Sequence, residues 1–424
     1  MLAFATLLMT GGAFGDRSGE RRIFVSGFVV FALSSAVCGL ARSGTELVAA
    51  RAIQGLGAAL IVPNSLALLN DACAGDSAVR ARALGLWNAA GGGLAVAAGP
   101  VVDRLLLSLC GWRGIFLVNL PICALGIWLA RFITETAPHE PKAPIDIPGQ
   151  FCAIIAVLAL TASIIEGGVS GWLRPEVLAG CVAAVAAGVA FVAIERRTPN
   201  PMLPLHLFRR PSFSTATCVG FLNNFAYYGL VFVLSFYFQT VRHYSTIQTR
   251  LAFVPLTGTV TISNLLGSRL ASKSGPRLPM VAGFAIASVA YVALHGIDAG
   301  TPYTLMLLPL AAIPFGLGLA IPAMTAALLA SVERQRASVS SATFTTVRQI
   351  GGALGVAIFG AIVAASGKTS MAGIQCVFVV CACSSAVACA LSVIGIGRDD
   401  NLAQTAHADA TGEVRVCPAP TCNS

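Results

Sequence analysis

The sequence is poor in charge. Asp, Glu, Lys and Arg make up 11% of its 424 residues, whereas apolar residues make up 56%. A soluble globular domain carries about 25% charged residues, so most of this chain cannot face water. A soluble globular protein is therefore excluded, and a lipid bilayer is the environment that remains.

Several patterns that carry enzyme or pump chemistry are also missing. The five histidines lie in loops, at helix ends or in the tail without metal-ligand spacing, and no Gly-rich phosphate-binding loop is present. Most of the thirteen cysteines lie in apolar segments, where a small polarizable side chain suits packing, and they suggest no disulfide framework. We expect no metal and no cofactor, and neither an enzyme nor an ATP-driven pump.

Long apolar segments recur along the chain. A helix of about 20 residues crosses the bilayer core of roughly 30 Å. The sequence predicts twelve crossings, at residues 24–41, 47–69, 83–107, 114–132, 148–167, 177–195, 213–239, 248–271, 278–296, 303–330, 341–366 and 372–396. A shorter apolar segment, 2–14, precedes them and has about half the length of a crossing. The predicted fold class is an all-α integral membrane protein.

Lys and Arg gather in alternate loops between these spans. Most of the chain's 27 basic residues, among them Arg196 and Arg197, fall on one side of the membrane. The positive-inside rule makes that side the cytoplasm, and it places the polar C-terminal tail there. The net charge of +9 then reflects membrane topology, and no nucleic-acid partner is needed to explain it.

The chain repeats itself internally. "GDRSGERRIFVSGF" at 15–28 is echoed at 271–284, "GLGAALIVP" at 55–63 is echoed at 316–322, and "GGLAVAAG" at 92–99 is echoed at 351–360. The echoes keep one order and a nearly constant separation of about 260 residues, which predicts two homologous halves.

The duplication leaves some spans without a counterpart. Spans 148–167 and 177–195 lie between the halves, and span 213–239 has no equivalent in the first half. We predict an N-terminal half at 1–132 that lacks its first helix and has a truncated second one. Two linking helices with their loops follow at 133–210, then a six-helix C-terminal half at 211–397 and a disordered cytoplasmic tail at 398–424.

Several motifs resemble one family of membrane proteins. "GGAFGDRSGERR" is similar to a cytoplasmic loop of the major facilitator superfamily. "RAIQGLGAA", "GWRGIFLVNLP" and "VRQIGGALGVAIFG" resemble its fourteen-helix drug:proton antiporter branch. The resemblance covers the chain to about Gly397 and implies two repeat-related helical halves with two extra linking helices.

The charged segment "GGAFGDRSGERRIF" at 11–24 interrupts the apolar pattern. In the resembling family, such a loop latches the two halves on the cytoplasmic side in one state and releases them in the other. The glycines would let the chain turn, and Asp16 would cap or pair with a helix end. The residues of this candidate gating loop are Gly12, Asp16, Arg17, Gly19, Arg21 and Arg22. A plain positive-inside anchor is the alternative.

Two arginines lie inside predicted spans. A buried guanidinium is costly unless it is paired, so each marks a candidate site. For Arg51 the resemblance implies proton coupling opposite an acid on the first helix, which this sequence does not contain. An arginine that snorkels to the interface is the alternative. The candidate proton-coupling or substrate-path residues are Arg51, Gln54, Gly55, Asn119, Asn224 and Arg348, although the asparagines could equally bond neighbouring helices.

The segment "GGGLAVAAGPVVDR" resembles the antiporter helix of the family, with two charges added. Small residues recur every fourth position, which lets a neighbouring helix approach closely, and Pro100 is expected to bend the helix. The candidate residues are Gly91, Ala95, Gly99, Pro100, Asp103 and Arg104. Asp103 and Arg104 stand where the family pattern has glycines. They predict either a new intramembrane ion pair or proton site, or drift in a chain no longer held to function.

The resulting functional hypothesis is a proton-coupled secondary transporter in a bacterial plasma membrane. Its substrates would be drugs or other amphipathic, often cationic, small molecules, and its energy source the proton gradient. A periplasmic adaptor protein is a further predicted partner. The alternative is a truncated, non-transporting remnant of such a transporter.

Overall fold

The protein is helical throughout the part that the structure describes. This computed structural model describes residues 2–72, 87, 95–133, 146–198, 205–332, 337–366 and 371–396, and no strand occurs among them. The helices are α1 (Leu2–Ser18), α2 (Glu20–Leu40), α3 (Gly44–Ala72), α5 (Ala95–Leu117), α6 (Asn119–Ala130), α7 (Ile147–Ser170), α8 (Pro175–Arg197), η2 (Leu205–Arg209), α9 (Pro211–Phe236), the π-helical η3 (Tyr237–Val241), α10 (Thr246–Ala252), α11 (Val254–Ser274), α12 (Arg277–His295), α13 (Tyr303–Ala330), α14 (Ala337–Ala365) and α15 (Met371–Gly395).

The spanning helices agree with the predicted spans. Ten of the described helices are long and apolar enough to cross a membrane, and a bent pair, Leu105–Leu117 with Asn119–Ala130, adds an eleventh. The remaining predicted span, 83–107, is described in part: residues 95–107 lie in α5, and most of 83–94 lies outside the described residues. The all-α membrane fold class is confirmed.

The predicted span 114–132 is not one straight helix. The pair α5 and α6 is bent by 44° where they meet at Val118. A second break lies at Gly111, whose φ of 66° is accessible to glycine because it has no Cβ. Gly111 therefore marks the boundary that was predicted between spans 83–107 and 114–132. Pro100 lies within α5, and a bend there stays a prediction.

The first helix extends further than its apolar segment. α1 runs to Ser18, so Gly12 lies inside the helix and not in a turn, contrary to the expectation for this glycine. Only Gly19 interrupts the chain between α1 and α2, with a φ of 93°. Gly275, its counterpart in the repeat, separates α11 and α12 with a φ of 77°.

The internal repeat appears in the helix packing. α1 and α2 both pack along α3, as α11 and α12 both pack along α13. A Cβ added to Gly11 would lie 2.1 Å from the carbonyl oxygen of Ala59, and one added to Gly267 would lie 2.3 Å from that of Leu319. The same close approach of helix backbones therefore recurs in both halves, as expected for repeat-related bundles.

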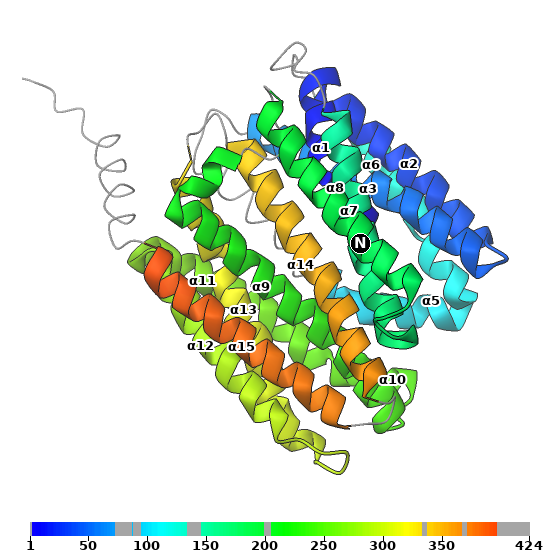
Figure 1. The fold of residues 1–424 in the computed structure, drawn as a ribbon. Helices are drawn as coiled ribbons and strands as arrows, with labels where there is room; N and C mark the ends of the chain where they lie inside the picture. The colour runs from blue at the N-terminus through cyan, green and yellow to red at the C-terminus, as the bar shows by residue number, and fades with distance from the viewer. Residues whose placement is uncertain are drawn as a thin grey trace, which may run out of the picture.

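Two additional helices connect the halves. In Figure 1, α7 and α8 run beside the orange α14, with the blue N-terminal helices on their other side. α7 packs on α8, α14 and α1. Thr10 of α1 donates a hydrogen bond to Gln150 of α7, and a Cβ on Gly168 would lie 2.4 Å from the Cβ of Ala361 in α14. α7 thus contacts both halves, whereas the exact domain limits stay a prediction.

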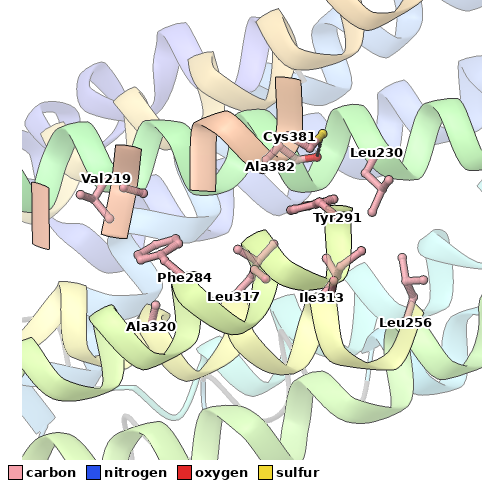
Figure 2. Close-up of a cluster of buried hydrophobic side chains, with 14 of the residues drawn as sticks. Val219, Leu230, Leu256, Phe284, Tyr291, Ile313, Leu317, Ala320, Cys381 and Ala382 are labelled. Atoms are coloured by element: carbon pink, nitrogen blue, oxygen red, sulfur yellow. Dashed lines mark hydrogen bonds between the residues drawn. The ribbon is translucent and has the colours of Figure 1, made fainter. Parts of the chain in front are cut away.

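The main hydrophobic core lies in the C-terminal half. Its buried members fall between Leu207 and Ile396, and the largest enclosed side chains come mostly from α9, η3, α12, α14 and α15. Figure 2 shows Phe284 and Tyr291 of α12 between residues of α13, such as Leu317, and residues of α9 and α15. This core holds α9 and α14 in the positions from which they supply the polar side chains described next.

Candidate transport site

The N-terminal half contains a chain of hydrogen-bonded polar side chains. Arg51 of α3 donates through Nη1 to Oε1 of Gln54, and Gln54 donates through Nε2 to Oγ of Ser35 on α2. Asn119 of α6 donates to the same Ser35 oxygen at 3.1 Å. Ser35 is fully buried and Gln54 is 2% exposed. Three helices are therefore joined at Ser35, which the sequence did not single out.

The helical periodicity explains the first of these contacts. Residues three apart share a helical face, and Arg51 and Gln54 do so, as predicted from their spacing. The guanidinium of Arg51 also lies over the ring of Phe116, at 5.7 Å from its centroid, in a cation–π contact. Within the described residues these neutral groups are its partners, and its side chain is exposed. A role in proton coupling stays a prediction.

The C-terminal half contains a second arginine cluster. Arg348 of α14 donates through Nη2 to Oδ1 of Asn224 on α9 at 3.2 Å, and Asn223 donates to the same oxygen at 3.4 Å. The guanidinium lies 5.3 Å from the ring centroid of Phe344. Arg348 and Asn224, both predicted as path residues, are therefore in contact although 124 residues separate them.

Glycines let α9 and α14 approach closely at this cluster. A Cβ on Gly220 would lie 2.5 Å from the Phe344 ring and 3.0 Å from Cγ of Arg348. A Cβ on Gly352 would lie 2.8 Å from the ring of Tyr228, and one on Gly355 would lie 2.2 Å from the carbonyl oxygen of Phe225. Small residues at such crossings bring facing polar side chains within hydrogen-bond distance in a membrane.

The candidate gating loop is only partly described. Arg21 donates through Nε to the carbonyl oxygen of Ala130 at 2.9 Å and through Nη2 to that of Arg131 at 3.4 Å, which ties the start of α2 to the end of α6. Arg22 follows on α2 and is not without a partner. The side chains of Asp16 and Arg17 lie outside the described set, so the latch stays a prediction.

The candidate antiporter helix is described only as backbone. Gly91 lies outside the described residues. Ala95, Gly99, Pro100, Asp103 and Arg104 belong to α5, but their side chains are not described. Gly55, the last of the predicted path residues, lies within α3 and is half-buried.

Ser35, which was not predicted as a site residue, is only weakly marked in the sequence. Ser35 is a hydroxyl in the middle of an apolar span, but Ser34 beside it has the same property. In the structure, Ser34 bonds to the carbonyl oxygens of Val30 and Phe31 in its own helix, at 2.7 and 3.0 Å. Only tertiary contacts distinguish the two serines.

The fold and these clusters define a class of protein. Repeat-related helical halves with a hydrogen-bonded arginine in each form the architecture of a multi-pass membrane transporter. The Major Facilitator Superfamily model matches residues 1–356, and the chain belongs to this family.

Relatives of known name support this assignment. The chain is 36% identical over 366 residues to the methylenomycin A resistance protein of Streptomyces coelicolor, covering 85% of this chain and 76% of that protein. It is 34% identical over 370 residues to the drug efflux pump JefA of Mycobacterium tuberculosis, covering 86% and 71%. The crystal structure of the human organic anion transporter MFSD10 has the same fold, with a TM-score of 0.62 at 17% identity over 92% of this chain and 81% of that one.

Proposed function

We propose that the chain is a proton-coupled exporter of drugs or other amphipathic small molecules across a bacterial plasma membrane. Its relatives include proteins named for antibiotic resistance and drug efflux. The observation that carries the proposal is the pair of arginine clusters within this family's fold, one in each half. The same relatives give no support to a non-transporting remnant.

The clusters suit a carrier that alternates between two states. Arg51 is held by a buried amide, and a fixed positive charge at membrane depth favours the charged form of any carboxylate that comes close. When a proton neutralises such a carboxylate, the carboxyl group is no longer attracted to the Arg51 guanidinium. Protonation of the carboxylate is therefore coupled to its distance from Arg51. The proton gradient would supply the energy, without a cofactor.

The proposal includes an orientation. The basic loops would face the cytoplasm, and the C-terminal tail would lie there too. A reporter active only in the cytoplasm should work when fused after residue 400, and one active only outside should work near Ser170, at the end of α7. A cytoplasmic signal at Ser170 would contradict this orientation. A periplasmic adaptor protein stays a prediction.

The export proposal is testable with purified protein. Reconstituted into vesicles, the chain should move an amphipathic dye against its gradient when a pH gradient is applied. An ionophore that collapses the pH gradient should abolish the movement, and empty vesicles are the control. Dye movement that is indifferent to the pH gradient would contradict proton coupling.

A further inference from the structure

The charge of Arg348 is not neutralised within the described part of the protein. A guanidinium has five N–H donors and stays protonated. The described contacts of Arg348 are one neutral amide oxygen, that of Asn224, and the ring of Phe344. Its Nε is buried without a hydrogen-bond partner, and no ion pair of Arg348 occurs among the described residues.

A guanidinium without a counter-charge inside the membrane costs free energy as long as no ligand is bound. An arginine at membrane depth usually pairs with an acid or lines a polar pathway. Arg348 has donors to spare, and the residue as a whole is only half-buried although its Nε is enclosed. An anion that pairs with it would relieve both the unpaired charge and the unused donor.

We propose that Arg348 binds a carboxylate of the exported molecule, with Asn224 as a second polar contact. The planar donors of arginine match the two oxygens of a carboxylate. Two aromatic rings lie near the cluster, since Phe344 lies beside the guanidinium and Tyr228 packs on Gly352, one turn along α14. The chemical class is an amphipathic acid: a carboxylate for the arginine and an apolar body for the rings. The inference rests on the proposed export function and names its substrate class.

A pair of probes that differ only in charge tests the site. The probes are 4-(pyren-1-yl)butanoate and its neutral amide, whose binding to the full chain in nanodiscs is followed by pyrene fluorescence. The wild-type protein should bind the acid about tenfold to a hundredfold more tightly, the range expected for hydrogen bonds to a charged group. Equal affinity for the acid and the amide would overturn the proposal.

Two variants test whether the preference for the acid over the amide depends on Arg348. Arg348→Gln should lose the preference for the acid, while its affinity for the amide changes by less than about twofold. Asn224→Asp places a carboxylate 3.2 Å from the guanidinium and should abolish the preference while keeping the arginine. Because this variant gains an ion pair, it also covers the case in which Arg348→Gln fails to fold. A preference that survives in both variants would overturn the proposal.

A control and a second assay separate this inference from the export function. Arg250→Gln in α10 makes the same charge change in the same half and should keep the preference for the acid. If Arg250→Gln also lost the preference for the acid, the preference would reflect the overall charge of the protein, and the assignment to Arg348 would be overturned. In vesicles, equal export of both probes would contradict the carboxylate site but support the export function. Selective binding of the acid without export of either probe would support the carboxylate site but contradict the export function.

Discussion

The two halves repeat one helix pairing but bury different side chains. In the C-terminal half, α12 places Phe284 and Tyr291 at 0% exposure in a continuous core. Among the described residues of the N-terminal half the buried apolar side chains are mostly small, while Leu33 and Leu40 of α2 are 64% and 72% exposed. The repeat therefore specifies where backbones cross, and the neighbours of each helix decide how much is buried.

The arginine clusters differ in a similar way. In each half an arginine donates to a side-chain amide and lies near a phenylalanine ring. The amide of Gln54 is in turn bonded to Ser35, which joins three helices. Arg348 instead crosses directly between α14 and α9. Each arginine makes one described side-chain hydrogen bond, but the amide that holds Arg51 is itself bonded to a second helix, whereas Arg348 bonds the second helix itself.

The largest expected difference between the halves concerns large apolar residues. Phe284→Ala should lower the free energy of unfolding by about 3–5 kcal/mol, because it opens a cavity in a closed core. Leu33→Ala, on a face that lipid covers, should change it by less than about 1 kcal/mol, since lipid tails are as apolar as leucine. Denaturant unfolding in micelles measures both. Equal losses would contradict the difference in packing.

A smaller difference is expected at the repeated glycines of α2 and α12. A Cβ on Gly283 would lie 2.3 Å from the backbone oxygen of Gly316, whereas one on Gly27 first meets the side chain of Ile61 at 2.9 Å. Backbone cannot yield as a side chain can, so Gly283→Ala should cost about 2–3 kcal/mol and Gly27→Ala about 1 kcal/mol. Thermal unfolding of the two variants gives the order. A larger loss for Gly27→Ala would show that the α2–α3 crossing is the tighter one.

Much of this architecture could be predicted from the sequence. The lengths of the apolar segments gave the spans, and the echo of "GDRSGERRIF" correctly predicted two related halves, with Gly19 and Gly275 at equivalent turns. The prediction for Gly12 was wrong because the apolar pattern ends before the helix does, and polar residues at its C-terminal end continue the helix to Ser18.

Contacts between distant segments could not be predicted. The bond between Arg348 and Asn224 depends on how α9 and α14 cross, and Gly220 and Gly352 permit that crossing without specifying a partner. Ser34 and Ser35 are identical in sequence context, so only the rotation of α2 selects Ser35. Side-chain pairing of this kind is a property of the tertiary structure.

The two serines provide the most selective comparison. Ser35→Ala leaves the donors of Gln54 and Asn119 without their acceptor, at a cost of about 1–3 kcal/mol, and releases the amide that holds Arg51. Ser34→Ala removes a bond within one helix and should change stability by less than about 0.5 kcal/mol. Ser35→Ala alone should also shift the pH profile of transport. Identical pH profiles in both variants would limit Ser35 to packing.

If substrate leaves in exchange for protons, as we propose, proton counterflow is the most direct measurement of the exchange. Vesicles containing the protein and an internal pH-sensitive dye receive an outward substrate gradient with no pH gradient imposed. The account predicts that substrate efflux acidifies the vesicle interior, and that the acidification is absent without protein. Substrate efflux with no change in internal pH would contradict it.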